Sequence, residues 1–210
     1  MLRATMIAAT FFGLISVANA TTIDQSQLNY NTGVPFAFSF APVTNYPLGQ
    51  SFTAGKSGLL ADIYLGSNGG IQGGGNTLTM DIHAGNGIGG TLLGHSTVNV
   101  TSVWTPIVGH WLLTIDTSNL GIDVVAGNQY TFDFTSVTGA GDLAYRGILG
   151  NTSNPYAGGR IYTGAGYGNQ PNWDLVFQTA VTDVPEPAPF TLLFSGLALI
   201  GCMLHRRKSD

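Results

Sequence analysis

The chain has 210 residues, of which 9% are charged and 44% are hydrophobic, and its formal net charge is −4. So few basic side chains make nucleic acid and anionic lipid poor partners, because both are bound through clusters of Lys and Arg. The hydrophobic content is too high, and the charge too low, for a disordered protein.

The first twenty residues have the three parts of a secretory signal peptide. Arg3 supplies a positive start, residues 6–17 are apolar, and Ala18-Asn19-Ala20 has the small-x-small pattern that signal peptidase cleaves. We therefore expect signal peptidase to cut after Ala20, so that the mature chain begins at Thr21. An uncleaved N-terminal anchor is the alternative, but the apolar stretch is too short to span a bilayer well.

Residues 21–183 are predicted to form the exported domain, and they are numerous enough to bury a core of their own. They contain three basic residues, Lys56, Arg146 and Arg160, against nine aspartates. The single cysteine of the chain, Cys202, lies outside this region. The domain therefore has no disulfide, and its stability must come from the packing of its core.

Short segments in which apolar and polar residues alternate run through this domain, separated by turns rich in Gly, Asn and Pro. A period of two is typical of half-buried strands in antiparallel sheets. It occurs over residues 36–40, 59–65, 77–84, 111–116, 130–135 and 175–178. Within the second of these, the alternation places Leu59 and Ile63 on one face and Leu60 on the other. No segment has the period of a helix, so we predict an all-β domain, an antiparallel two-sheet sandwich of the jelly-roll type.

The predicted domain shows no recognisable catalytic set, and we expect no enzymatic activity and no cofactor. Its carboxylates are all aspartates, and its serines and histidines match no nucleophile or zinc motif. Asp81 and His83 share the polar face of one predicted strand and could begin an acid–base or metal site, but such pairs are common on solvated strands. A structural calcium ion held by Asp and Asn beside the glycine turns is a further alternative, without a matching loop motif.

Aromatic residues at predicted strand ends and in loops are the remaining candidates for ligand binding. Exposed Trp and Tyr rings can stack on sugar rings. The Gly-rich segment 156–167 contains Tyr156, Arg160, Tyr162 and Tyr167, and Trp173 follows it, so this segment is a candidate binding loop. The favoured interpretation is that these rings cap the core, which is the usual role of strand-end aromatics. Trp104 and Tyr145 belong to the same class.

The C-terminal region combines three features in a fixed order. Val184-Pro185-Glu186-Pro187 is an extended spacer, because proline lacks an amide donor and fixes φ. Residues 189–204 are uncharged and largely apolar, and we expect them to form a transmembrane helix. Arg206, Arg207 and Lys208 follow as a basic cluster of the kind that stays on the cytoplasmic side of a membrane.

The length of the apolar run bears on its role. As a helix it would rise only about 25 Å, against a hydrocarbon core of about 30 Å, so it is short for a permanent span. A plain single-pass anchor remains the main alternative to a sorting signal, because flanking Arg and Lys side chains can snorkel. A buried core helix is disfavoured by the basic cluster that closes the segment.

The order of VPEP motif, hydrophobic helix and basic cluster in residues 184–210 resembles the PEP-CTERM sorting tail of Gram-negative bacteria. The resemblance implies recognition by an exosortase, a membrane-embedded enzyme similar to cysteine transpeptidases, which is thought to cleave near the PEP motif. It also implies a link to exopolysaccharide and biofilm production.

The expected route follows from both ends of the chain. The protein is exported through the inner membrane, held there by its C-terminal helix, and then found on the cell surface or in the extracellular medium after processing. Two alternatives for the domain itself stay open: a carbohydrate-binding module for the exopolysaccharide, and a secreted hydrolase. The shortage of carboxylates and nucleophile motifs argues against the hydrolase.

Overall fold

The computed structural model describes residues 20–31, 38–39, 48–71, 76–138, 147–163 and 172–183. All of them belong to one compact unit, Ala20–Val184. The predicted signal peptide, the VPEP motif, the predicted helix 189–204 and the basic cluster lie outside the described residues. Among the helical segments that are described, none has the length and apolar character needed to cross a membrane.

The described part of the chain is almost entirely β-structure. Its helical content is one short 3₁₀ turn, η1 (Ser118–Leu120). The strands are β1 (Thr21–Gln27), β2 (Phe38–Ser39), β3 (Leu48–Thr53), β4 (Gly58–Ser67), β5 (Thr77–Ala84), β6 (Thr91–Thr105), β7 (His110–Asp116), β8 (Asp123–Val124), β9 (Gln129–Thr138), β10 (Gly147–Ile148), β11 (Gly150–Asn151), β12 (Ile161–Thr163), β13 (Asp174–Leu175) and β14 (Phe177–Thr182). The prediction of an antiparallel all-β domain is therefore confirmed.

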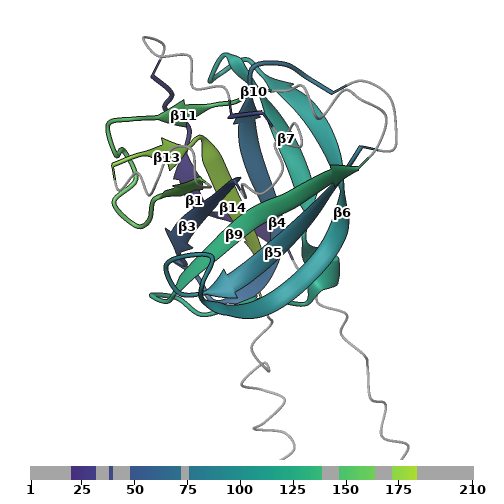
Figure 1. Cartoon of the computed structure of the whole chain (residues 1–210), viewed down its shortest axis with the longest axis vertical. Coiled ribbons are helices and arrows are strands. Elements are labelled where there is room, and N and C mark those ends of the chain that lie inside the picture. The colour runs from purple at the N-terminus through teal and green to yellow at the C-terminus, as the bar shows by residue number, and fades with distance from the viewer. Residues whose placement is uncertain are drawn as a thin grey trace, which may run out of the picture. The chain divides into compact units, whose positions relative to one another are not determined.

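Most of the strands belong to one curled antiparallel sheet with the order β1-β14-β4-β7-β6-β5-β9-β3-β12 (Figure 1). The long strand β6 allows the sheet to curl, because it changes partner along its length. Residues 91–99 of β6 pair with β5, whereas residues 100–105 pair with β7. In Figure 1, β6 wraps around the right-hand side of the molecule, and β5 and β9 cross in front of β4. The two arms of the sheet thus face each other.

The core fills the space between these two arms. Phe52 on β3, Phe132 on β9 and Phe177 on β14 are fully buried. The rings of Phe132 and Phe177 pack edge to face with centroids 6.1 Å apart, which joins strands that are distant in the sheet order. Burial of side chains of this size contributes roughly 2–3 kcal/mol each, so contacts between the arms hold the curl closed.

The alternation predicted for residues 59–65 is wrong at its start. Leu60 is fully buried, whereas Leu59 is only half-buried. The pairing with β14 explains this: Val181 lies opposite Leu60 and Ala180 lies opposite Asp62, so Ala61 is an extra residue on β4. Such a β-bulge shifts the inward and outward phase of a strand by one residue. From Asp62 to Leu65 the predicted alternation is observed.

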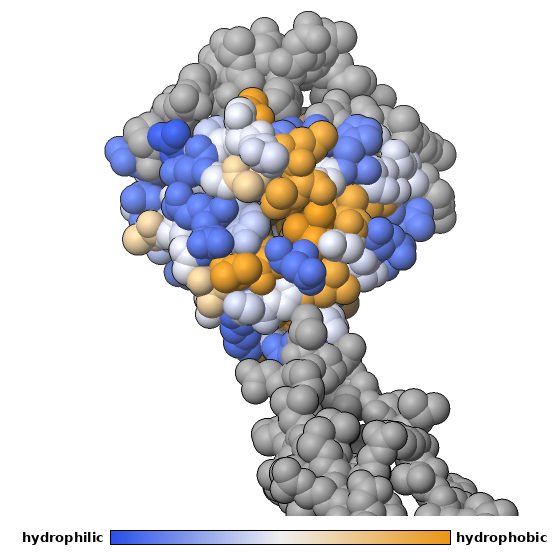
Figure 2. Space-filling model, turned by 90° about the horizontal axis from the view of Figure 1, so that it is seen from below, coloured by the Kyte–Doolittle hydropathy of each residue, from blue (hydrophilic) through white to orange (hydrophobic). Residues whose placement is uncertain are grey.

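The described chain begins and ends at the same end of the unit. Thr21 in β1 lies directly opposite Thr182 in β14. Thr182 in turn lies opposite Leu59, which also pairs with Asp123 of β8. Viewed from below, this face shows a continuous area of apolar side chains (Figure 2). Large apolar residues exposed on the strands and turns near this end include Ile23, Leu92, Leu93 and Val125.

Candidate functional site

Asp81 and His83 of β5 belong to a cluster built by three strands. Asp133 of β9 and His95 of β6 both lie directly opposite Asp81 in the pairing of their strands. Residues directly opposite one another on antiparallel strands project from the same face of the sheet. Met80 and Ile82 of β5 point into the core. Asp81 and the residues opposite it therefore lie on the other face of the sheet, away from the core. We refer to Asp81, His83, His95 and Asp133 as the Asp–His cluster.

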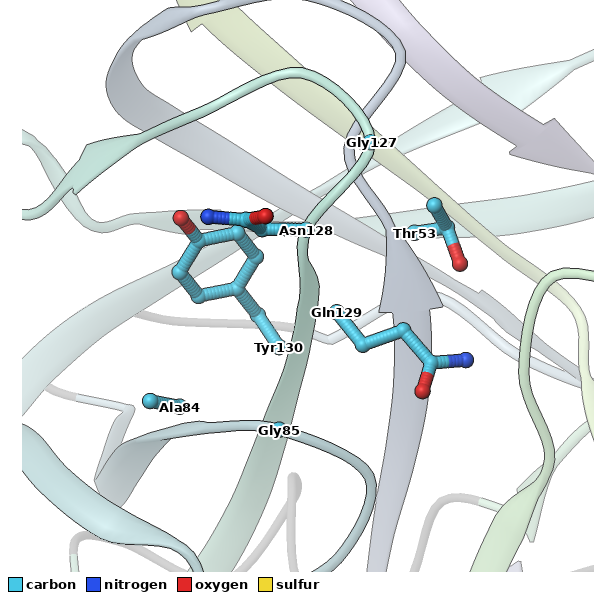
Figure 3. A pocket seen from close by; sticks show the side chains of 7 residues that line it. All are labelled: Thr53, Ala84, Gly85, Gly127, Asn128, Gln129 and Tyr130. Atoms are coloured by element: carbon cyan, nitrogen blue, oxygen red, sulfur yellow. The ribbon is translucent and has the colours of Figure 1, made fainter.

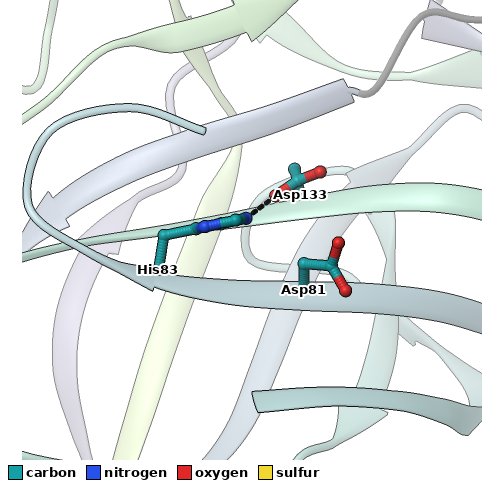
Figure 4. A group of neighbouring side chains, drawn as sticks. All are labelled: Asp81, His83 and Asp133. Atoms are coloured by element: carbon teal, nitrogen blue, oxygen red, sulfur yellow. Dashed lines mark ion pairs between the residues drawn. The ribbon is translucent and has the colours of Figure 1, made fainter. Parts of the chain in front are cut away.

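The side chains of this cluster contact one another in two pairs. Nε2 of His83 lies 2.9 Å from Oδ1 of Asp133, and Nδ1 of His95 contacts Oδ1 of Asp81. Figure 4 shows His83 and Asp81 on the same side of one strand, with the imidazole directed at Asp133 on the next. One donor atom each from Asp81, His83 and Asp133 can be chosen so that all three lie within 4.8 Å of one another.

The turn between β5 and β6 is held against this same face. The amide of Gly87 donates to Oγ1 of Thr131 at 2.7 Å, and the Thr131 hydroxyl donates to the carbonyl of Gly85 at 2.8 Å. Nδ1 of His83 lies 3.3 Å from the carbonyl oxygen of Gly90 in the same turn. Asp133 is only 3% exposed and His83 is also buried, although the alternation predicts a solvated face.

Burial changes the acidity of Asp133. Removal from water raises the pKa of its carboxyl from 3.8 to about 6. The neighbouring His83 lowers this pKa, and the negative charge of Asp81 raises it, but both effects are smaller than that of burial. Asp133 therefore exchanges its proton close to neutral pH, unlike an ordinary surface aspartate.

Arg160 and Tyr162 of the candidate binding loop lie on the same face as the Asp–His cluster. Tyr162 in β12 pairs with Gly49 of β3, which itself lies opposite Asp133. The Tyr162 hydroxyl donates to the side-chain carbonyl of Asn86 in the turn beside His83. Nε of Arg160 donates to the same hydroxyl at 2.9 Å. The sequence contained no signal that residues 81–83 and 160–162 would share a face of the sheet, because this depends on the order of the strands.

The remaining aromatic candidates are largely packed against the protein. The Tyr156 ring packs edge to face on Phe177 with centroids 5.1 Å apart, and its hydroxyl accepts a hydrogen bond from the amide of Thr53 at 3.0 Å. Tyr162 is 5% exposed, and Trp173 is half-buried against the core. Tyr145 and Tyr167 lie outside the described residues.

Among the aromatic candidates that the structure describes, Trp104 is the exposed one. It is 48% exposed, and its ring meets that of Trp111 at an interplanar angle of 63° with centroids 5.7 Å apart. An edge-to-face pair of this kind is not the flat platform on which sugar rings stack. In the described part of the chain, the geometry of these rings therefore favours structural roles over carbohydrate binding.

An open pocket of about 590 Å³ lies where β3 ends and β9 begins (Figure 3). Its polar side chains include Thr53, Asn128 and Gln129. The Thr53 hydroxyl and the Gln129 amide both donate to the carbonyl of Gly158, at 2.8 and 3.4 Å, so these groups are engaged in holding the 156–160 segment. The pocket has no charged side chain in its lining and offers no acid–base chemistry.

The chain was compared with models of known protein families and with curated proteins. No model of a known protein family matches the chain, and a search of curated proteins finds no match.

Proposed function

We propose that this chain is an exported, surface-associated or secreted protein of Gram-negative bacteria that is sorted by an exosortase, is linked to exopolysaccharide or biofilm, and has no catalytic activity. The observation that carries the proposal is the order of VPEP motif, apolar run and basic cluster in residues 184–210. A signal peptide in residues 1–20 is the matching export signal. Signal peptidase and the exosortase are the expected processing enzymes.

The fold of the exported part agrees with this role. We interpret the curled sheet as a jelly-roll-like sandwich of two layers that share β6. One layer contains β5, β9, β3 and β12, and the other contains β7, β4, β14 and β1. Its core is built without a cysteine, so the domain can fold after export without disulfide formation.

The position of the chain ends also supports tethering by the tail. Because Thr21 and Thr182 are paired, the chain continues toward residue 184 from the same end at which the mature chain is expected to begin. That end has the exposed apolar side chains of Figure 2. In a protein held by its tail, a surface of this kind is suited to lie against the membrane interface.

The alternative activities have weaker support. A hydrolase of the glycosidase type needs two accessible carboxyl groups, and Asp81 with Asp133 is one pair that the structure brings together. Asp133 is buried, so a polysaccharide could not reach its carboxyl group. The carbohydrate-binding alternative depends on exposed rings, and Tyr156, Tyr162 and Trp173 are packed.

The proposal is tested by separating a sorting signal from a plain anchor. Glu186→Ala leaves the hydrophobicity of the apolar run unchanged, so an anchor would be indifferent to it. We expect Glu186→Ala, or loss of the exosortase in the host, to increase the ratio of full-length to tail-cleaved protein measured by intact mass. Asp183→Ala is the matched control, because it removes the same charge three residues before Glu186, outside the motif.

Two outcomes would contradict the proposal. If neither Glu186→Ala nor loss of the enzyme changes the ratio, the tail is only an anchor. If Asp183→Ala changes the ratio as much as Glu186→Ala does, charge near the membrane and not the motif controls processing.

A further inference from the structure

We propose that His83, Asp133 and Asp81 form a binding site for one divalent transition metal ion of the Zn²⁺ class. The site is independent of the sorting proposal, because all its donors lie on β5 and β9. Nε2 of His83 and one carboxylate oxygen from each aspartate are the proposed ligand atoms, and one donor atom from each of the three residues lies within 4.8 Å of the others. Zinc bonds of about 2.1 Å allow separations up to about 4.2 Å, so small side-chain rotations complete the site.

The orientation of the His83 ring is the first argument. Its Nδ1 faces the carbonyl oxygen of Gly90 at 3.3 Å, and a carbonyl can only accept a hydrogen bond. In the neutral tautomer in which Nδ1 donates to this carbonyl, Nε2 presents its lone pair toward Asp133. Histidines that bind metals commonly donate their second ring N–H to a backbone carbonyl in this way.

The unsatisfied oxygen of Asp133 is the second argument. Its Oδ1 is buried and accepts no hydrogen bond in that tautomer, and Nε2 of His83 lies 2.9 Å away. A lone pair and a carboxylate oxygen thus face each other in a site removed from water. Buried polar atoms without a partner are rare and costly, and a cation between these two atoms would satisfy both.

The placement of Asp81 completes the donor set. It lies directly opposite Asp133, where two negative charges on neighbouring strands repel each other unless a cation is present. His95 contacts the Asp81 carboxylate, as outer residues do when they orient a ligand. The cluster remains accessible from this side, since the His95 side chain is 59% exposed and that of Asp81 is 18% exposed.

The donor atoms indicate which ion would bind. Imidazole nitrogen with carboxylate oxygen suits Zn²⁺ and neighbouring transition metals, whereas Ca²⁺ prefers six or more oxygen ligands. The expected consequence is structural: the ion would join β5 to β9 and, through His83, hold the 85–90 turn in place. This differs from the calcium site considered at the glycine turns.

The experiment uses full-length protein without an affinity tag, purified in detergent and stripped of metal with EDTA. Zn²⁺ is then added in a calorimetric titration. We expect saturable binding of one ion per chain, weakened at least tenfold by His83→Ala and by Asp133→Asn, while millimolar Ca²⁺ does not compete. Asp62→Asn is the matched control, because Asp62 and Asp116 also face each other on adjacent strands but have no histidine between them.

A second measurement keeps the proposal testable if a variant fails to fold. The chain has four histidines, and their ring nitrogens can be observed in the wild-type protein by ¹⁵N NMR. Zn²⁺ should shift Nε2 of His83. Three results would overturn the proposal: no saturable binding, binding unchanged in both cluster variants, or Zn²⁺-induced shifts confined to histidines other than His83.

Discussion

Gln50 and Asp174 are hydrogen-bonded to each other in the interior, with 3.0 Å between Nε2 and Oδ1, and both residues are fully buried. Oε1 of Gln50 also accepts from the amide of Leu175 at 2.9 Å. Oδ2 of Asp174 accepts from the amide of Tyr156 at 3.0 Å. These bonds connect β3, β13 and the start of the candidate binding loop, and burial raises the pKa of Asp174 above its usual value.

Replacing Gln50 should therefore destabilise the domain strongly. Gln50→Leu keeps the approximate size of the side chain but leaves the Leu175 amide and Asp174 Oδ1 buried without partners. We expect a loss of about 3 kcal/mol in the free energy of unfolding, measured by urea denaturation. Gln178→Leu is the control, because Gln178 bonds to Ser26 at an exposed position and its loss should cost far less. Equal losses in the two variants would show that the buried bonds contribute little.

The second prediction concerns the pH dependence of stability in metal-free protein. The pKa of Asp133 is raised to about 6 in the folded state, so folding favours its protonated form. This stabilisation is fully present below pH 3.8 and is lost as the pH rises through 6. Asn resembles the neutral form, so Asp133→Asn should gain stability relative to wild type as the pH rises across this range.

The measurement for Asp133 is urea denaturation at a series of pH values between 4 and 7. Asp123→Asn serves as the control because Asp123 is exposed. A difference between Asp133→Asn and wild type that stays constant over this range would contradict the assignment.

The third prediction tests how closely the 156–160 segment packs on β3. A Cβ atom at Gly159 would lie 1.8 Å from the carbonyl oxygen of Ser51, whereas one at Gly89 would meet nothing within 4 Å. Gly159→Ala should therefore cost about 2–3 kcal/mol, because backbone must move to admit the methyl group. Gly89→Ala should change the melting temperature little. If Gly159→Ala causes no loss of stability, the 156–160 segment is not held against β3.

The fourth prediction separates core aromatics from a ring that is free to contact a ligand. Phe177→Ala removes a fully buried ring that contacts Phe132 and Tyr156, and we expect a loss of 3–5 kcal/mol. Trp104→Ala should cost less than about 1 kcal/mol, because roughly half of that residue is exposed. Both losses in the free energy of unfolding would be measured by thermal unfolding of a fragment that contains residues 20–184. Comparable losses would show that Trp104 is part of the core.

Local alternation was sufficient to predict several strands and the faces of their side chains. In β5, the predicted Leu78, Met80 and Ile82 are fully buried, and in β9 Tyr130, Phe132 and Phe134 are buried as predicted. The period of two acts over a few residues and depends only on the geometry of an extended chain. For this reason the fold class could be predicted from the sequence.

The strand β6 could not be predicted in the same way. Of its fifteen residues, only Val98 and Val100 are buried, and the adjacent Leu92 and Leu93 are both exposed, so no long alternation of apolar and polar residues marks it in the sequence. The pairing of β6 with β5 and β7 depends on contacts between distant segments. The curl of the sheet depends on this pairing. The bulge at Ala61 has the same origin, because the extra residue is defined by the pairing with β14.

The sequence by itself determined the all-β class, the absence of disulfides in the domain and the order of features in the tail, because each of these is local. Only the tertiary structure decided that Asp133 joins Asp81 and His83, and that the 85–90 turn lies against His83. A strand pattern shows which side chains share a face. It does not show which strand becomes the neighbour or what covers that face, since both depend on contacts between segments far apart in the chain.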